Sequence, residues 1–139
     1  MKTYTYKQKK NIDKQSILNL YNDAGWIAYT KDPKTLFKGI ENSYYVLSAW
    51  DKNKLVGLMR VVSDGCTILY IQDILVLKEY KRQGIGTTLI NETIKKFINI
   101  RQKVLLTEDN TETRGFYESL GFDSCDKGQL VSFIYNPKK

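Results

Sequence analysis

The sequence predicts an α+β protein, with a mixed, mostly antiparallel central sheet of about seven strands flanked by four helices. Three observations predict this class. Short alternating or apolar runs, separated by polar turns, dominate the first half of the chain. A pair of glycines then opens a segment with helical apolar spacing, and strand-like runs resume after it. No linker-like stretch interrupts the pattern, so residues 1–139 are expected to form one domain.

The first half of the chain should contain two helices and four strands. Residues 3–7 alternate like a short strand, and the apolar stripe that follows predicts a helix ending near Gly25. Asp32 and Pro33 suit the N-cap and first position of a second helix. An antiparallel meander should follow, with strands at residues 44–50, 55–62 and 66–77.

The second half predicts the parallel part of the sheet. A helix opens at Gly84, and a short buried strand follows at residues 103–107. A strand, a helix and a strand in succession should cross over and pair in parallel. Asn110 can cap a further helix that Gly121 closes, and residues 122–125 and 129–135 resemble a final pair of strands.

Composition limits the possible chemistry. The chain has 22 Lys and Arg against 15 Asp and Glu, a net charge of +7, and no histidine. The missing imidazole excludes Ser-His-Asp catalysis and disfavours a zinc site, so no metal is expected. The basic residues are scattered, so they favour either a phosphorylated ligand or simple solvation, and no nucleic-acid partner is expected.

The sequence also bears on where the protein is located. No apolar run is long enough to span a membrane, and the first residues lack the apolar core of a secretion signal. Cys66 and Cys125 do not form a disulfide framework and are expected to be reduced. We therefore expect a cytoplasmic protein with no membrane partner.

The loop from Lys81 to Gly86 is the clearest candidate for a binding site. It lies between a predicted strand and a predicted helix, where free N–H groups and the helix dipole favour phosphate. A P-loop would need Gly-Lys-Ser or Gly-Lys-Thr, which is absent, and a dinucleotide fingerprint would need glycine at Leu89. A helix that merely begins with glycines remains the alternative.

Two segments resemble the GNAT superfamily of acetyl-CoA-dependent N-acetyltransferases. Residues 81–86 are similar to that family's Gln/Arg-x-x-Gly-x-Gly/Ala loop, with Lys81 in the first place. Residues 116–122, FYESLGF, resemble its FYEKLGF helix, and the element order is also similar. The resemblance implies acetyl-CoA as the acetyl donor, with the pantetheine arm paired along a splayed strand. It implies these cofactor-binding residues: Leu75, Val76, Leu77, Lys81, Arg82, Gln83, Gly84, Ile85, Gly86, Thr87, Thr88, Asn110 and Phe116.

The same resemblance implies the catalytic groups. Tyr117 is the candidate acid, because a phenol can protonate the departing thiolate, although it could also be a core aromatic. A backbone N–H near Val76 would bind the oxyanion. Residues 71–76 resemble a family strand in which a Glu is the base, but Gln72 takes its place and cannot accept a proton. Asp73 then remains as the candidate base or ammonium anchor, unless it is structural or a water chain serves as base.

The acceptor site is suggested by aromatic and polar residues. Trp26, Tyr29, Asp64 and Gln72 are the candidates, since aromatics with carboxylates suit an amine, although aromatics are also common in cores. The expected activity is direct acetyl transfer to a small primary amine, such as an arylalkylamine or a polyamine, with a homodimer as one option. The alternatives are a non-catalytic acyl-CoA-binding module, a protein lysine or N-terminal acetyltransferase, and, last, a nucleic-acid-binding domain.

Overall fold

The computed structural model describes residues 2–137, which fall into two compact units. The first unit extends to Leu106 and the second begins at Thr107. The first contains the whole sheet and four of the α-helices. Its elements are β1 (Thr5–Lys7), α1 (Lys14–Asp23), α2 (Ile27–Thr30), α3 (Pro33–Glu41), β2 (Tyr45–Asp51), β3 (Lys54–Ser63), β4 (Ile68–Val76), the 3-10 helix η1 (Lys78–Tyr80), α4 (Ile85–Lys96) and β5 (Gln102–Leu105).

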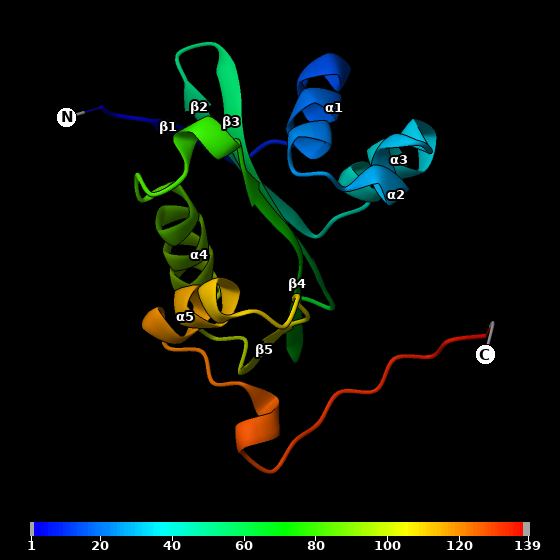
Figure 1. Cartoon of the computed structure of the whole chain (residues 1–139), viewed down its shortest axis with the longest axis vertical. Helices are drawn as coiled ribbons and strands as arrows, with labels where there is room; N and C mark the ends of the chain where they lie inside the picture. The colour runs from blue at the N-terminus through cyan, green and yellow to red at the C-terminus, as the bar shows by residue number, and fades with distance from the viewer. Residues whose placement is uncertain (1, 138–139) are drawn as a thin grey trace. The chain divides into compact units, whose positions relative to one another are not determined.

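The five strands lie in the order β1-β2-β3-β4-β5. The first four pair antiparallel, and β4 pairs in parallel with β5, which confirms the predicted crossover unit. Helix α4 lies on one face of the sheet, and α1, with α2 and α3 beside it, lies on the other (Figure 1). Because both faces are covered, β3 is buried continuously from Leu55 to Val61.

Local sequence signals account for the helix boundaries in the first unit. Asp13 caps α1 by accepting a hydrogen bond from the Ser16 N–H at 3.0 Å. Gly25 follows that helix with a φ of +76°, which an L side chain rarely adopts. Asp32 is the N-cap of α3 and Pro33 its first residue, as predicted. The core between the helices and the sheet contains Leu20, Tyr21, Leu58, Met59, Leu89 and Ile90.

The second unit is small. It contains α5 (Thr111–Ser119) and the 3-10 helix η2 (Cys125–Lys127). Asn110 caps α5 through its side-chain oxygen, which accepts from the Thr113 N–H at 2.8 Å, as predicted. Gly121, with a φ of +93°, follows the helix as expected. Arg114 ties the unit together through ion pairs with Asp109 at 2.6 Å and Asp126 at 3.4 Å.

Two predictions about the element count are wrong. The described sheet has five strands, because residues 122–125 and 129–135 pair with no strand and the latter are exposed. A strand needs a hydrogen-bonding neighbour, and the apolar pattern alone does not supply one. The number of α-helices is five, since the short α2 follows Gly25 where no helix was predicted. Within the described residues, no helix is both long and apolar enough to cross a membrane.

Candidate functional site

The strands β4 and β5 pair with each other only along the first half of β4. Their parallel pairing runs from Ile68 beside Gln102 to Ile71 beside Leu105, where β5 ends. Strand β4 continues to Val76, paired over that stretch with β3 alone among the described strands. From Gln72 to Val76, the edge of β4 on the β5 side therefore has no strand neighbour among the described strands. The predicted splayed strand pair is therefore present.

The hydrogen-bonding pattern shows which backbone groups face that open edge. The Leu77 N–H donates to the Val56 carbonyl at 2.9 Å. Because an antiparallel ladder alternates bonded and non-bonded pairs, Leu75 also pairs toward β3, whereas Ile74 and Val76 direct their N–H and C=O groups away from it. Of the three strand residues named from the sequence, only Val76 thus presents backbone groups to the open side, and Ile74 joins it.

The open edge leads through η1 to the N-terminus of α4. The first helical hydrogen bond runs from the Thr88 N–H to the Gly84 carbonyl at 3.0 Å. The N–H groups of Ile85, Gly86 and Thr87 consequently have no partner within the helix. Gly84 is the N-cap with a φ of +85°, and a Cβ built there would meet no atom within 4 Å. Free N–H groups at a helix start are suited to an anion, so the binding of a phosphate at this loop stays a prediction.

Packing against the sheet holds this helix start in place. Ile85 is buried, and a Cβ at Gly57 of β3 would lie only 3.1 Å from its Cγ2 atom. The absence of a side chain at Gly57 therefore lets α4 approach the sheet closely. The Gln83 side-chain oxygen accepts a hydrogen bond from the Tyr4 hydroxyl, which orients the residue just before the helix. The Thr88 N–H is used inside the helix, so Thr88 does not extend the anion surface through its backbone.

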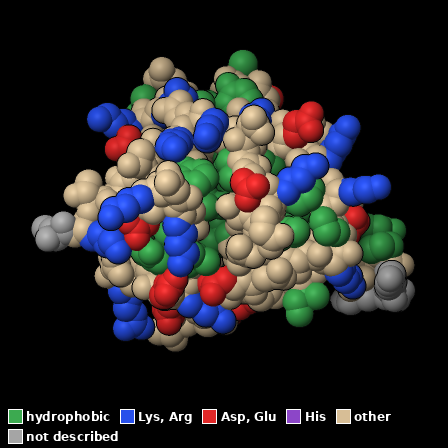
Figure 2. All heavy atoms as spheres, turned by 90° about the horizontal axis from the view of Figure 1, so that it is seen from above, with side chains coloured by type: hydrophobic (Ala, Val, Ile, Leu, Met, Phe, Trp, Pro, Cys, Tyr) green, Lys and Arg blue, Asp and Glu red, His purple; other side chains and the backbone are tan. Residues whose placement is uncertain are grey.

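The charge around the loop is mixed. Lys81 and Arg82 are exposed, and Arg82 has a φ of +64°, which turns the chain sharply before Gly84. Nearby, Lys54 pairs with Glu79 at 2.6 Å, and the Tyr80 hydroxyl donates to Asp51 at 2.7 Å. Basic and acidic side chains are likewise interspersed on the face shown in Figure 2. The chain around Lys81 and Arg82 thus carries acidic as well as basic side chains, namely Glu79 of η1 and Asp51 of β2.

A buried ion pair lies in the middle of the sheet. The Arg60 Nε donates to the Asp73 Oδ2 at 2.6 Å, and the two side chains are 8% and 3% exposed. The Tyr21 hydroxyl donates to the same oxygen at 2.9 Å, and the Tyr29 hydroxyl donates to Oδ1 at 2.8 Å. Burial and the Asp73 carboxylate raise the pKa of Tyr21, so this phenol stays protonated and remains a donor. Both Asp73 oxygens are thus occupied.

These contacts bear on the expectation that Asp73 is the general base or the ammonium anchor. A general base must reach the substrate proton, whereas the Asp73 carboxylate is buried and both of its oxygens already accept hydrogen bonds from the protein. Asp73 instead acts on its surroundings by fixing the hydroxyl of Tyr29. The alternative, a structural Asp with a buried partner, agrees better with the contacts, since that partner is Arg60.

Tyr29 and Gln72 lie together at the edge of this cluster. The Gln72 Nε2 donates to the Tyr29 hydroxyl oxygen at 3.1 Å, and Arg60 donates to the same oxygen at 3.3 Å. Gln72 is exposed and is the extra residue where the β3–β4 register shifts, so a bulge turns it outward. Trp26 lies 6.1 Å from the Tyr29 ring between centroids. Three of the four predicted acceptor residues are therefore neighbours.

Asp64, the fourth, has a different role. Its carboxylate accepts hydrogen bonds from the N–H groups of Cys66 and Thr67 at 2.9 and 2.7 Å and from the Thr67 hydroxyl at 2.5 Å. These bonds hold the pKa of Asp64 well below its usual range. The carboxylate is consumed in shaping the turn between β3 and β4. These contacts account for Asp64 through the turn, and its role at the acceptor site stays a prediction.

The second unit contains the remaining predicted residues, described within that unit alone. Tyr117 contacts Phe116 and Phe122 edge to face, with centroids 5.1 and 5.6 Å apart. Burial raises the pKa of Tyr117 to about 12, so the phenol is protonated at neutral pH. Asn110 uses its oxygen as the helix cap, and its amide N–H groups are not needed for that bond.

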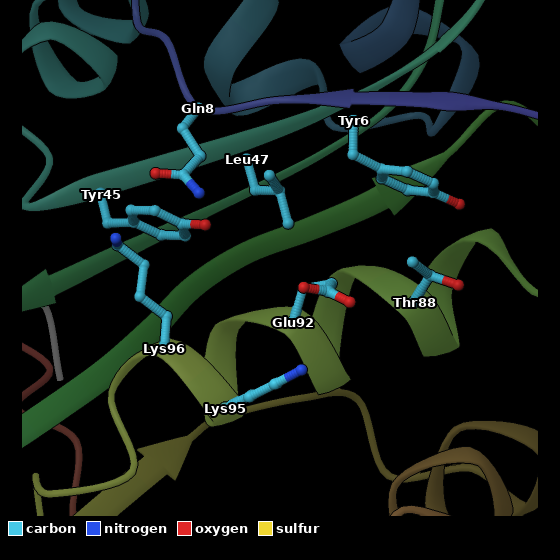
Figure 3. A pocket seen from close by; sticks show the side chains of 8 residues that line it. All are labelled: Tyr6, Gln8, Tyr45, Leu47, Thr88, Glu92, Lys95 and Lys96. Carbon is cyan, nitrogen blue, oxygen red and sulfur yellow. The ribbon is translucent and has the colours of Figure 1, made fainter.

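Sequence reasoning missed two features of the first unit. Arg60 sits within an apolar strand, and a charge there signals a buried partner, which could have identified the ion pair with Asp73. The other is a groove of about 560 Å³ between β1, β2 and α4 (Figure 3), which no local sequence pattern indicated. Its lining residues are Tyr6, Gln8, Tyr45, Leu47, Thr88, Glu92, Lys95 and Lys96. Among the described residues, no cluster of His, Cys, Asp or Glu could hold a metal ion.

A parted parallel strand pair next to a glycine-capped helix start is the arrangement of an acetyltransferase fold. The chain belongs to the acetyltransferase (GNAT) family, whose family model matches residues 14–122. It is similar to a GNAT-family acetyltransferase from Streptococcus pneumoniae TIGR4, at 30% identity and a TM-score of 0.86, over 99% of this chain and 100% of that chain.

Curated proteins of two other organisms are also similar to this chain. A protein of Pyropia yezoensis, named as an uncharacterized N-acetyltransferase, is 26% identical over 131 residues, which are 91% of this chain and 74% of that protein. A protein of Gibberella zeae, named as an acetyltransferase, is 31% identical over 102 residues. These are 67% of this chain, and the chain spans about half of that relative, 54% of its length.

One further solved structure shares the fold. It is an aminoglycoside acetyltransferase from an uncultured soil metagenomic sample, in complex with sisomicin. It is 23% identical, with a TM-score of 0.71, over 96% of this chain and 95% of that chain.

Proposed function

We propose that the protein transfers an acetyl group from acetyl-CoA to a primary amine of a small molecule, by direct attack within a ternary complex. The observation that carries the proposal is the continuous path from the open edge of β4 to the N-terminus of α4. Along this path, Ile74 and Val76 offer strand-like backbone groups, and Ile85, Gly86 and Thr87 offer helix-start N–H groups. An amide-containing arm and a pyrophosphate need these two surfaces in this order.

The chain's own residues have distinct roles in the proposed reaction. A backbone N–H near Val76 stabilises the negative charge on the thioester oxygen as the amine nitrogen bonds to the carbonyl carbon. The carbon–sulfur bond then breaks, and Tyr117 donates its proton to the departing thiolate. Its raised pKa keeps that proton available at neutral pH. The proton lost by the amine passes to water, because Gln72 cannot accept it and Asp73 already accepts hydrogen bonds on both oxygens. Water in turn returns a proton to the Tyr117 phenolate, so the phenol is restored and the proton balance closes.

The acceptor site in this proposal is the aromatic and amide surface of Trp26, Tyr29 and Gln72. Arg60 and Asp73 neutralise each other, so they support this surface without giving it net charge. The Gln72 Nε2 is bonded to Tyr29, which leaves its side-chain carbonyl oxygen for an N–H group of the acceptor. Asp73 is a positioning residue here, since it fixes the Tyr29 hydroxyl that orients Gln72.

A panel of amines assayed for release of the CoA thiol tests the proposal. It should include arylalkylamines, polyamines, an aminoglycoside, and peptides with a free N-terminus or an internal lysine. Thiol release above the amine-free rate with a small amine supports the proposal, and a preference for peptides would indicate a protein acetyltransferase.

A second candidate is a non-catalytic acyl-CoA-binding module. The observation that favours it is the combination of Gln72, which cannot be a base, with a buried Asp73 carboxylate whose two oxygens both accept hydrogen bonds from the protein. Such a module would bind acetyl-CoA with measurable affinity yet release no thiol with any amine of the panel. The two candidates are therefore separated by measuring binding and turnover on the same preparation.

A further inference from the structure

The last residue of α1 contacts the connection that leads from β4 to α4. The Asp23 Oδ2 accepts a hydrogen bond from the Lys78 N–H at 2.8 Å, although the two residues are 55 positions apart in the chain. Lys78 is the first residue of η1, and the N-cap residue of η1, Leu77, makes no side-chain hydrogen bond to it. Asp23 therefore caps η1 from a different element of the first unit.

The helix α1 itself gains nothing from an aspartate at its end. A negative side chain at a helix C-terminus opposes the helix dipole, and Asp is one of the weaker helix-forming residues. The last turn of α1 contains no basic residue that would compensate this charge. Within the first unit, the half-buried Asp23 carboxylate has the Lys78 N–H as its partner. The contact with η1 thus accounts for this residue, whereas the local preferences of the helix do not.

The connection from η1 to α4 has a backbone conformation that needs support. Arg82 has a φ of +64°, which an L side chain rarely adopts and which persists only where the surrounding structure enforces it. Side chains of the first unit hold this connection through three hydrogen bonds, from Lys78 to Asp23, from Tyr80 to Asp51 and from Tyr4 to Gln83. Among these three, the bond to Asp23 is the one that fixes the backbone directly, because its donor is a main-chain N–H.

The same end of α1 also supports the proposed acceptor surface, through a different residue. Tyr21 donates to Asp73 at 2.9 Å, and its ring lies 5.8 Å from that of Trp26 between centroids. These contacts do not involve the Asp23 side chain. Removing the Asp23 carboxylate should therefore change the connection to α4 and leave the acceptor surface intact.

We propose that Asp23 is a positioning residue for acetyl-CoA. Its carboxylate fixes the first N–H of η1 and thereby holds the following loop, residues 81–84, in the conformation that presents the free N–H groups at the start of α4. The inference rests on the proposed function, which supplies the ligand. Without the bond, the loop occupies its binding-competent conformation for a smaller fraction of the time, and the apparent affinity falls by that fraction.

Calorimetric titration of acetyl-CoA tests the proposal with two substitutions at one position. Asp23→Ala removes the accepting oxygen and should bind acetyl-CoA roughly tenfold more weakly. Asp23→Asn loses the charge but keeps an oxygen that can accept from Lys78, so it should bind at least as tightly as the wild type. Charge alone predicts tighter binding for both variants, because removing a negative side chain favours a polyanionic ligand. The opposite signs therefore separate positioning from electrostatics.

Glu41 provides the matched control. It is the exposed last residue of α3, and within the first unit its carboxylate has no hydrogen-bond partner. Glu41→Ala removes the same charge from the same kind of helix end, so it should bind acetyl-CoA like the wild type. Weaker binding by Glu41→Ala, matching that of Asp23→Ala, would overturn the proposal, as would equal losses in Asp23→Ala and Asp23→Asn.

Amide hydrogen exchange followed by NMR tests the contact in the absence of any ligand. The Lys78 N–H should exchange faster in Asp23→Ala than in the wild type and should stay protected in Asp23→Asn. The melting temperature of Asp23→Ala should remain near that of the wild type, because relief of the unfavourable dipole interaction offsets the lost bond. Unchanged exchange at Lys78, or a melting temperature that falls together with the affinity, would contradict a positioning role.

Steady-state kinetics should show the same separation. With an amine that the panel identifies, Asp23→Ala should raise the KM for acetyl-CoA and leave the KM for the amine unchanged, because the Tyr21 contacts remain. A wild type that binds no acetyl-CoA would refute the proposed function and this inference with it. A wild type that binds, with Asp23→Ala binding equally well, would overturn the positioning role alone.

Discussion

The Arg60 guanidinium and the Asp73 carboxylate form a buried ion pair at 2.6 Å between directly opposite residues of β3 and β4. The pair joins the central strands next to the bulge at Gln72. It also fixes the Tyr29 hydroxyl from two sides, through Asp73 at 2.8 Å and Arg60 at 3.3 Å. The proposed acceptor surface is therefore built on this ion pair.

Removing one partner should be more damaging than removing both. Arg60→Met leaves the Asp73 charge buried and uncompensated, so we expect a loss of about 3–5 kcal/mol in the free energy of unfolding. The double variant Arg60→Met/Asp73→Leu should lose less than Arg60→Met. Urea unfolding followed by circular dichroism measures both. Lys54→Met, which breaks the exposed pair with Glu79, is the control and should change little; equal effects of Arg60→Met and Lys54→Met would refute the account.

Tyr29→Phe should affect the acceptor more than the cofactor. The change removes one hydroxyl that donates to Asp73 and accepts from Gln72 and Arg60. We expect the KM for the amine to rise roughly tenfold, equivalent to about 1.4 kcal/mol, with acetyl-CoA affinity unchanged. Steady-state kinetics and calorimetry separate the two effects. Tyr44→Phe, at an exposed tyrosine, is the matched control, and a KM that stays the same in Tyr29→Phe would remove Tyr29 from the site.

Two substitutions at Asn110 separate its capping role from cofactor binding. Serine retains a capping oxygen but lacks the amide, so Asn110→Ser should preserve stability and weaken acetyl-CoA binding. Asn110→Ala loses the cap as well and should cost about 1 kcal/mol of stability. Thermal unfolding and calorimetry on the same samples give both quantities. If Asn110→Ser binds acetyl-CoA as tightly as the wild type, Asn110 is a cap alone.

Tyr117 should make the protein sensitive to strong alkali. Its pKa is raised from about 10 in the unfolded chain to about 12 by burial, so the folded state favours the neutral phenol. The contribution of the neutral phenol to the free energy of unfolding is fully present below pH 10 and is lost as the pH rises through about 12. Tyr117→Phe, which cannot ionise, should therefore lose less stability than the wild type between these values, as followed by urea unfolding.

The same substitution tests the catalytic role of Tyr117. Without the phenolic proton, turnover should fall while acetyl-CoA affinity is retained, since Phe preserves the edge-to-face contacts with Phe116 and Phe122. Turnover measured with the most active amine of the panel checks this. Unchanged turnover would leave Tyr117 as a core aromatic of α5.

Local patterns predicted most of the fold. Sequence patterns predicted the helix starts at Asp32 and Asn110 and the helix ends at Gly25 and Gly121. They also predicted the meander and the parallel strand pair. These features were predictable because capping residues, glycines and apolar periodicity act over a few neighbouring positions. The final strands were predicted wrongly for the converse reason. Their apolar pattern shows a preference for burial, and the partner that would satisfy it is not encoded nearby.

The site was predicted less completely. The loop at Gly84 could be found, since a glycine between a strand and a helix is visible in the sequence. The occupation of Asp73 by Arg60, Tyr21 and Tyr29 depends on residues up to 52 positions away, and no local pattern reports such pairing. The turn at Asp64 was predicted, but the four hydrogen bonds that its carboxylate accepts within that turn were not.

Calorimetric titration of acetyl-CoA tests the central claim most directly. The wild type should bind, and Gly84→Val should bind at least roughly tenfold more weakly, because a β-branched residue at a φ of +85° distorts the start of α4 and its Cβ occupies the open space. The control Gly115→Ala, in α5 with no atom within 4 Å of its Cβ, should bind like the wild type. A folded wild type that shows no binding, or a Gly84→Val variant that binds equally well, would contradict the account.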